Sequence, residues 1–388
     1  MARDTFVTRV APERALLLAV ASKGSREKQA AESSMAELVQ LVTSAGAEVV
    51  GKIIQHLTGT SGAYYVGKGK LQELIDLREK LDYTVLVLDD ELAPSQQHNL
   101  EEALKVKVID RAALILDIFA RRARTREGRL QVELAQHQYL LPRLAGQWLH
   151  LERLGGGIGT RGPGESQLET DRRLIRRKIQ HLKEQIEDVR KQRSLYRQKR
   201  QKSGVPVVAL VGYTNAGKST LLNALCQAGV LTDDRLFATL DSTTRRLTLP
   251  DRTTVLLTDT VGFIRKLPPA IISAFRATLE ELGEANLLLH VVDLASPDAA
   301  AQCRTVEDIL GELALADKPR LTVLNKIDLL LERQRYWDEK SALDYLSKEV
   351  GPPDADTVLV SAVRKWGLAR LQEMISGCLV GNTAVPKS

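Results

Sequence analysis

The chain has little cysteine, few aromatic residues and no long apolar run. Its three cysteines, Cys226, Cys303 and Cys378, are widely spaced and form no C-x-x-C pair, which argues against a disulfide framework or a zinc site and favours a reducing compartment. No apolar stretch approaches the roughly 20 residues that a membrane span needs, and residues 1–10 lack the apolar segment of a signal peptide. We therefore expect a cytoplasmic protein without a membrane span, and we take it to be a monomer.

The bulk composition is that of an ordinary globular protein with an excess of positive charge. A length of 388 residues favours two or three domains, and 44% hydrophobic residues are enough to build full cores. The formal net charge of +6 only hints at a polyanionic partner, so the position of the basic residues matters more.

Residues 1–120 alternate apolar, strand-like runs with helical patterns. The runs cover residues 14–22, 47–57, 83–88 and 106–109, and the helical patterns cover 25–45, 71–80, 95–104 and a segment from 112. This alternation predicts an N-terminal α/β domain with a parallel sheet. The turn from Gly67 to Lys70 could hold a phosphate at a helix N-terminus, but it lacks the full phosphate-loop pattern, and a plain strand-to-helix turn is the favoured interpretation.

Residues 121–202 predict two long helices that pack as an antiparallel hairpin. Leu130, Leu134, His137 and Leu141 lie on one helical face, and Pro142 is expected to end that helix. A second helix is expected from Asp171, and its apolar seam consists of Ile175, Ile179, Leu182, Ile186 and Val189.

The segment between these helices, residues 154–166, contains six glycines and a proline, and the stretch after it is strongly basic. From Arg172 to Lys202 there are thirteen Lys and Arg residues against three acidic ones. A flexible linker and a solvated helix face are the plain interpretations. The excess of positive charge favours contact with an RNA backbone instead. Stacking on single-stranded bases is not favoured, because Tyr196 offers only one aromatic ring. The expected contacts are Gly156, Gly157, Gly159, Arg161, Gly162, Gly164, Arg172, Arg173, Arg176 and Arg177.

Residues 203–380 again alternate strands and helices, and residues 381–388 are expected to be a frayed tail. Gly212 to Ser219 (GYTNAGKS) fits G-x-x-x-x-G-K-[ST] between an apolar strand and a helix, which is the context that a phosphate loop needs. Lys218 is expected at the β- and γ-phosphates and Ser219 at Mg²⁺. The pattern predicts a doubly wound sheet with this loop at the end of its first strand.

Four further motifs follow in order, and together they indicate a GTPase. Asp259 to Gly262 (DTVG) would hold Mg²⁺ through water and meet the γ-phosphate, and Thr239 in Phe237 to Asp241 (FATLD) is typical of a switch I threonine that binds Mg²⁺. Asn325 to Asp328 (NKID) predicts selection of guanine, because the Asp328 carboxylate can accept from both N1–H and the amino group, and the Ser361–Ala362 loop would meet the guanine O6.

These motifs define the expected site. The expected catalytic residues are Lys218, Thr239, Asp259 and Gly262, and the expected Mg²⁺ ligands are Ser219 and Thr239, with Asp259 acting through water. The expected GTP contacts are Gly212, Tyr213, Thr214, Asn215, Ala216, Gly217, Lys218, Ser219, Thr220, Phe237, Ala238, Thr239, Leu240, Asp241, Asp259, Thr260, Val261, Gly262, Asn325, Lys326, Ile327, Asp328, Ser361, Ala362 and Val363.

The residue after Gly262 is Phe263, where many GTPases carry the glutamine that orients the attacking water. Since phenylalanine cannot position water, we expect slow hydrolysis unless a partner or potassium completes the site. Asn215 matches the asparagine that supports potassium in some related GTPases, so K⁺ joins GTP and Mg²⁺ as an expected cofactor.

With these residues in view, the chain resembles the HflX family of translation-associated GTPases over nearly its whole length. The most specific match is Gly156 to Arg173 (GGIGTRGPGESQLETDRR), supported by Arg124 to Gly128 (RTREG) and Leu141 to Leu144 (LPRL). The resemblance implies binding to the large ribosomal subunit and its rRNA, hydrolysis stimulated by ribosomes, and splitting or rescue of stalled ribosomes, with the glycine-rich tip near the peptidyl transferase centre. Some members of the family are reported to use ATP through the N-terminal domain, but no complete phosphate loop precedes residue 205 here.

Two alternatives to a ribosome-splitting GTPase stay open at this point. In the first, GTP only gates attachment to RNA or ribosomes, for example in subunit assembly or anti-association, and turnover is incidental. Phe263 keeps this interpretation open. The second is an ATP-dependent RNA-remodelling protein, against which Asp328 argues.

Overall fold

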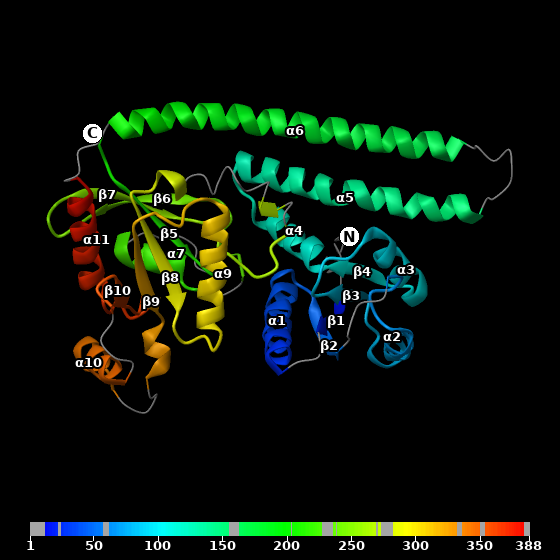
Figure 1. The fold of residues 1–388 in the computed structure, drawn as a ribbon, viewed down its shortest axis with the longest axis horizontal. Helices are drawn as coiled ribbons and strands as arrows, with labels where there is room; N and C mark the ends of the chain where they lie inside the picture. The colour runs from blue at the N-terminus through cyan, green and yellow to red at the C-terminus, as the bar shows by residue number, and fades with distance from the viewer. Residues whose placement is uncertain are drawn as a thin grey trace, which may run out of the picture. The chain divides into compact units, whose positions relative to one another are not determined.

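The computed structural model describes residues 12–21, 25–56, 62–154, 163–202, 204–226, 236–237, 239–268, 271–272, 282–331, 336–349 and 354–383 (Figure 1). Contacts within the chain define two units, which are described separately. Residues 1–118 and 136–177 form unit 1, and residues 119–135 and 178–388 form unit 2. Among the described helices, none is both long enough and apolar enough to cross a membrane.

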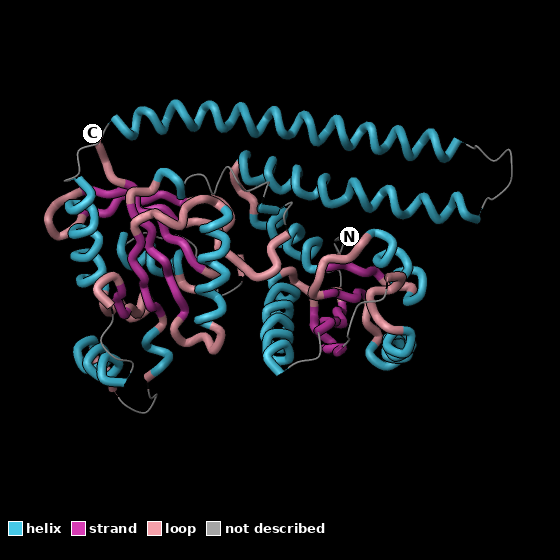
Figure 2. The backbone as a smooth tube through the Cα atoms, viewed as in Figure 1, coloured by secondary structure: helices cyan, strands magenta, loops and turns pink. Residues whose placement is uncertain are grey.

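Unit 1 contains a four-stranded parallel sheet in the order β2-β1-β3-β4 (Figure 2). Its elements follow the predicted alternation: β1 (Arg14–Ala21), α1 (Ser25–Ser44), β2 (Glu48–His56), α2 (Lys68–Leu81), β3 (Val85–Leu88), α3 (Pro94–Leu104), β4 (Lys107–Asp110) and α4 (Arg111–Arg122). Leucine and valine side chains from β1, β3 and β4 are fully buried against α2 and α3, so the apolar runs of the sequence form the core.

The helix α5 (Arg126–Leu154) continues through Pro142, so the prediction that Pro142 ends it was wrong. Tertiary contacts on either side of the proline hold the helix. The Tyr139 hydroxyl donates to Asp110 Oδ1 over 2.8 Å, and Arg143 Nη2 donates to Asp110 Oδ2 over 2.8 Å. Arg143 Nη1 also donates to the Tyr139 carbonyl. These buried, charge-assisted bonds oppose the roughly 3 kcal/mol that an interior proline costs.

The helix α6 (Pro163–Lys202) begins eight residues before the predicted start at Asp171. Proline is compatible with the first turn of a helix, where its missing N–H has no partner to lose, so Pro163 starts the helix here. Within unit 2, Lys178 of α6 forms a 3.0 Å ion pair with Glu133 of α5. Leu182 of the predicted seam is buried, whereas Arg173, Arg176 and Arg177 are exposed.

Unit 2 contains a six-stranded sheet in the order β10-β9-β8-β5-β7-β6, in which only the pairing of β6 with β7 is antiparallel. Its remaining elements are β5 (Val207–Gly212), α7 (Lys218–Cys226), β6 (Thr243–Thr248), β7 (Thr254–Asp259), β8 (Leu287–Asp293), α9 (Ala299–Glu312), β9 (Arg320–Asn325), a 3-10 turn η1 (Ile327–Leu330), α10 (Glu339–Glu349), β10 (Thr357–Leu359) and α11 (Leu368–Thr383).

Helices cover both faces of this sheet (Figure 2). The helices α7 and α11 share one core cluster with the strands, and α9 packs against β5 and β8 with its own buried residues Val306, Ile309 and Leu310. The strand order reverses on either side of β5, which makes the carboxyl end of β5 the switch point where a doubly wound sheet binds its ligand.

Candidate nucleotide-binding site

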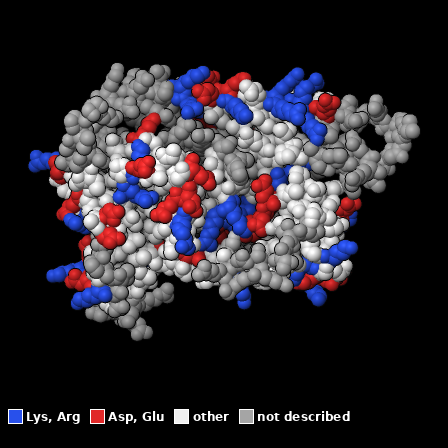
Figure 3. Space-filling model, viewed as in Figure 1, with Lys and Arg blue, Asp and Glu red and all other residues white. Residues whose placement is uncertain are grey.

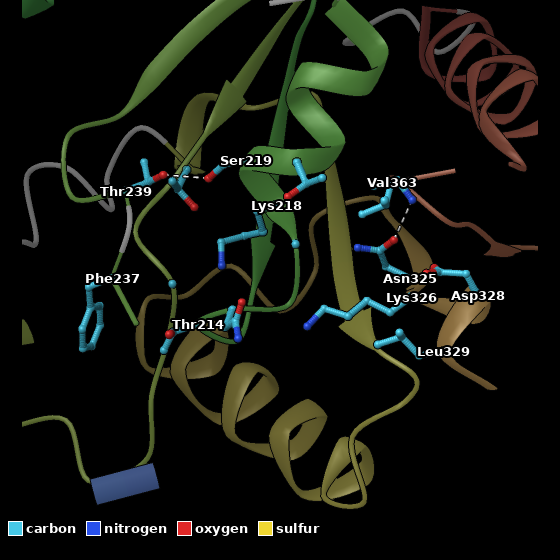
Figure 4. Close-up of a pocket in the computed structure, with 16 residues that line it drawn as sticks. Thr214, Lys218, Ser219, Phe237, Thr239, Asn325, Lys326, Asp328, Leu329 and Val363 are labelled. Carbon is cyan, nitrogen blue, oxygen red and sulfur yellow. Dashed lines mark hydrogen bonds between the residues drawn. The ribbon is translucent and has the colours of Figure 1, made fainter. Parts of the chain in front are cut away.

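A cleft of about 500 Å³ opens at the carboxyl ends of the unit 2 strands, around the loop that follows β5 (Figure 4). Five described segments far apart in sequence meet there, and four of them follow the parallel strands β5, β7, β9 and β10, which end at the same edge of the sheet. The residues that line it are Thr214, Asn215, Gly217, Lys218, Ser219, Thr220, Phe237, Thr239, Thr260, Gly262, Asn325, Lys326, Asp328, Leu329, Ala362 and Val363.

The loop from Gly212 to Lys218 presents a buried cation to this cleft. The Lys218 side chain is only 6% exposed, and its Nζ donates to the carbonyls of Gly212 and Tyr213 over 3.2 and 2.8 Å. Burial lowers the pKa of Lys218 to about 8, against the opposing charge of Asp259. A buried ammonium held only by neutral carbonyls is suited to accept phosphate oxygens, which would restore its ordinary pKa.

A second corner of the cleft has the donor set of a magnesium site. Ser219 Oγ lies 2.7 Å from Thr239 Oγ1 and 2.6 Å from Asp259 Oδ2, and Thr239 Oγ1 lies 3.0 Å from the same carboxylate oxygen (Figure 4). Asp259 Oδ1 is buried without a hydrogen-bond partner among the described residues. Burial raises the pKa of Asp259 in spite of Lys218 and both hydroxyls, so a bound cation would hold this carboxyl ionised.

This donor set fits Mg²⁺, which prefers hydroxyl, carboxylate and water oxygens and keeps several waters. Ser219 and Thr239 would bind it directly and Asp259 through water, and the ion would supply positive charge to the phosphates. The part of the chain that the structure describes contains no cluster of three His, Cys, Asp or Glu side chains that could hold a metal ion.

The opposite end of the cleft is arranged for a base. Asn325 joins two loops, since its amide donates to the Ala216 carbonyl over 2.9 Å and accepts from the Ala362 N–H over 3.1 Å (Figure 4). Ser361 Oγ donates to Asp328 Oδ1 over 2.6 Å, which orients the carboxylate and leaves acceptor positions on both of its oxygens for a ligand. Leu329, which is 62% exposed, lines the cleft here although the motifs did not single it out.

Phe263 lies outside the cleft and contacts the phosphate loop through its backbone. Its carbonyl accepts from the Thr214 N–H over 2.7 Å, and its N–H donates to the Gly212 carbonyl over 3.1 Å. The side chain is 3% exposed and lines a small apolar pocket with Leu267 and Ile271. The described part of the site therefore contains no side chain at this position that could orient water, as the sequence indicated.

Gly262 leaves no room for a side chain, because a Cβ there would lie 2.7 Å from Thr214 Cα and 2.9 Å from Lys218 Nζ. The backbone of the segment from Asp259 to Gly262 (switch II) can therefore approach the phosphate loop closely only at a glycine.

Some predicted residues fall outside the lining of the cleft. The predicted residues that are buried and do not line the cleft are Gly212, Tyr213, Ala216, Leu240, Val261, Ile327 and Ser361. Asp259 does not line the cleft itself, but it contacts Ser219 and Thr239, which do. The Asp241 carboxylate instead accepts a hydrogen bond at the start of α5. Ala238 lies outside the described residues.

Only some of the predicted RNA contacts lie among the described residues. Gly156, Gly157, Gly159, Arg161 and Gly162 lie outside the described residues, and Gly164 falls in the first turn of α6. Arg172 is half-buried, and Arg173, Arg176 and Arg177 are exposed along the helix.

A doubly wound sheet with a phosphate loop, two switch segments and a guanine-type loop defines the chain as a P-loop GTPase. Over 374 residues it is 50% identical to GTPase HflX of Caldanaerobacter subterraneus subsp. tengcongensis, an alignment that covers 96% of this chain and 82% of that protein. The chain belongs to the HflX family of GTPases, and its reaction is the hydrolysis of GTP.

A second relative and the family models agree with this assignment. GTPase HflX of Lacrimispora saccharolytica is 55% identical over 81% of this chain and 74% of that protein. Family models described as GTP-binding GTPase N-terminal, GTP-binding GTPase Middle Region and 50S ribosome-binding GTPase match residues 32–120, 122–200 and 207–326. A GDP complex of a GTP-binding protein from the archaeon Sulfolobus solfataricus aligns with 95% of this chain and 99% of that chain, at a TM-score of 0.47 and 24% identity.

Proposed function

We propose that the chain binds the large ribosomal subunit and its rRNA in the cytoplasm and uses GTP-dependent switching to split or rescue stalled ribosomes. In this proposal the residues of the cleft hold GTP and Mg²⁺ as predicted, and hydrolysis is slow until the ribosome completes the site. Residues 1–120, 121–202 and 203–380 would act as an N-terminal domain, a helical hairpin and a GTP-binding domain.

The observation that carries this proposal is the basic surface of α6. Arg173, Arg176 and Arg177 are exposed on neighbouring turns. Lys and Arg side chains, with a few acidic ones between them, lie along the described part of this helix (Figure 3). Lysine and arginine rows of this kind neutralise phosphates of nucleic acid and release counterions. The match of residues 207–326 to a family described as a 50S ribosome-binding GTPase supports the choice of partner.

A second candidate function is favoured by one observation. The buried side chain of Phe263 leaves the site without a water-orienting group at that position, as expected of a GTP-gated RNA- or ribosome-binding factor in which turnover is incidental. The two functions differ in one respect, because only the first requires that ribosomes accelerate hydrolysis.

The chain is expected to cosediment with isolated large subunits when it holds a non-hydrolysable GTP analogue, and far less with GDP or without nucleotide. Large subunits should also raise the single-turnover rate of GTP hydrolysis at least about tenfold, because they supply the missing water-orienting group. Binding without any acceleration would favour the second candidate, and failure to bind in every nucleotide state would contradict both.

A charge-reversal variant localises the contact. Changing Arg172, Arg173, Arg176 and Arg177 to glutamate should reduce subunit binding at least about tenfold and flatten its salt dependence, with GTP affinity unchanged. A matched control reverses four exposed charges on other elements, namely Arg304, Lys340, Lys348 and Arg370. Equal losses in the two variants would mean that net charge, rather than α6, drives binding.

Potassium is expected to accelerate hydrolysis. Asn215 is exposed in the cleft and has a left-handed backbone (φ 61°), so its amide oxygen can reach a cation beside the phosphates. Hydrolysis should be about tenfold faster in KCl than in NaCl at equal ionic strength, and Asn215→Ala should remove the difference. Equal rates of the unaltered protein in the two salts would refute a role for potassium.

A further inference from the structure

The carboxylate of Asp241 does not line the nucleotide cleft but accepts hydrogen bonds from residues at the start of α5. Its Oδ2 accepts from the backbone N–H groups of Arg124 and Thr125 over 2.8 and 2.9 Å, and the Thr125 hydroxyl donates to Oδ1. These bonds join positions more than a hundred residues apart, all within unit 2. Three donors on one carboxylate are charge-assisted bonds and among the stronger contacts that a loop can make.

Thr125 is itself the N-cap of α5. Its hydroxyl accepts from the Gly128 N–H over 3.0 Å, and its carbonyl accepts from the Arg129 N–H over 3.1 Å. The carboxylate therefore lies at the amino end of a helix, where free N–H groups and the helix dipole favour an anion.

The contact is closely fitted at Gly128. A Cβ built on Gly128 would lie 2.3 Å from Asp241 Oδ1 and 3.2 Å from Thr125 Oγ1. Alanine normally stabilises the interior of a helix relative to glycine, but here its methyl group would displace the carboxylate.

The other end of the same loop faces the proposed magnesium site. Thr239 Oγ1 contacts Ser219 and Asp259, and only Leu240, whose side chain is buried, separates Thr239 from Asp241. Two residues of chain span at most about 7 Å, so the position of one side chain restricts the other. Phe237 adds a second attachment, because its ring packs edge to face on Phe119 with centroids 4.6 Å apart.

We propose that Asp241 is a positioning residue, which holds Thr239 at the magnesium site by binding the amino end of α5, so that α5 senses the nucleotide state through switch I. The proposal rests on the proposed role of Thr239 as a Mg²⁺ ligand. By linkage, a nucleotide that orders switch I must order the first turn of α5, and the reverse. The later turns of α5, from Gln136, belong to unit 1, so the signal enters a helix that both units share.

The first test compares nucleotides in the full chain. Asp241→Ala and Gly128→Ala should each weaken binding of a non-hydrolysable GTP analogue with Mg²⁺ at least about tenfold, and should raise the Mg²⁺ concentration that this binding requires. GDP affinity should change less than about twofold, because GDP does not need switch I closed. Gly311→Ala, on the exposed side of α9 with open space around it, is the matched glycine control and should change neither affinity.

The second test uses amide hydrogen exchange in the segment 119–128. The N–H groups of Arg124 and Thr125 should exchange more slowly with the GTP analogue than with GDP, and Asp241→Ala should abolish the difference. Thr125→Ser, which keeps the hydroxyl, should retain it, whereas Thr125→Val should reduce it. A purely structural role predicts instead equal losses of GTP and GDP affinity with a lowered Tm, and that outcome would overturn the proposal, as would no change in either variant.

Thr239→Ala distinguishes failure of this positioning role from failure of the proposed magnesium site on which it rests. If Thr239→Ala leaves the Mg²⁺ requirement unchanged, the proposed magnesium site is wrong. If Thr239→Ala raises that requirement and neither Asp241→Ala nor Gly128→Ala does, the magnesium site stands and the positioning role fails.

Discussion

Replacing Lys218 by methionine should lower GTP affinity by about 150-fold to 5,000-fold and reduce hydrolysis to the uncatalysed rate. Methionine fills nearly the same volume, so the change removes charge while preserving the packing around a side chain that is only 6% exposed. Removing one partner of a buried, charge-assisted contact costs about 3–5 kcal/mol, which corresponds to this range. Titration with a fluorescent GTP analogue measures the affinity, and single-turnover hydrolysis measures the rate.

The pH dependence of binding provides an internal control. Burial lowers the pKa of Lys218 to about 8 in the free protein, and bound phosphates would raise it, so binding takes up a proton above that pH. GTP affinity of the unaltered protein should therefore be constant up to about pH 8 and then fall by at most about tenfold per pH unit. Lys218→Met should lose this slope. A variant that keeps the slope would show that another group titrates.

Unfolding of Lys218→Met would also abolish GTP binding, and the thermal stability of the nucleotide-free variant distinguishes the two causes. Because the folded state lowers the pKa of Lys218 from its ordinary value, burying the charged form opposes folding at pH 7, and stability from this group increases only as pH rises above about 8. The Tm of nucleotide-free Lys218→Met should thus be no lower than that of the unaltered protein. A marked drop would assign the loss of binding to the fold.

Periodic patterns in the sequence predicted the strands and helices of both sheets, but local signals misplaced one boundary of each long helix. Of the two prolines, Pro142 is predicted to end the first helix, and Pro163 is predicted to lie in the glycine-rich segment outside the second helix, which is expected to begin at Asp171. The first is overridden by Arg143 and Tyr139, which both bind Asp110 and fix the helix from outside. The second occupies the first turn of α6, where proline is tolerated. The first outcome could not be predicted from nearby residues, because Asp110 lies in another part of the sequence.

Much of the cleft could be predicted because phosphate and guanine recognition uses short motifs at strand ends. The role of Asp241 could not, since its partners, Arg124 and Thr125, lie in another region of the sequence and contribute backbone N–H groups that no side-chain pattern marks. Leu329 was missed for a related reason. It contributes only apolar surface beside Asp328, and exposed leucines are common.

Replacing Asp328 by asparagine should exchange the base that the cleft selects. The Asp328 carboxylate is expected to accept from N1–H and from the amino group of guanine, and Ser361 Oγ already orients it over 2.6 Å. Asparagine has one acceptor oxygen, and its NH₂ group, a donor, stands where the carboxylate has its second acceptor oxygen. GTP affinity should fall by about 100-fold or more, because two charge-assisted bonds are lost and the guanine amino group then faces an N–H₂ group.

The same variant should bind xanthosine triphosphate more tightly than GTP, because xanthine carries a carbonyl oxygen where guanine carries its amino group, and the new amide can donate to it. The carboxylate of the unaltered protein should reject this base by charge repulsion. Competition of GTP, xanthosine triphosphate and ATP against a labelled analogue measures the exchange, with Ser361→Ala as a control that loosens Asp328 without changing its charge. ATP should bind poorly to every variant, since adenine lacks both the donors and the carbonyl. Tight ATP binding in this cleft would remove the basis for guanine selection and reopen the interpretation of the chain as an ATP-dependent RNA-remodelling protein.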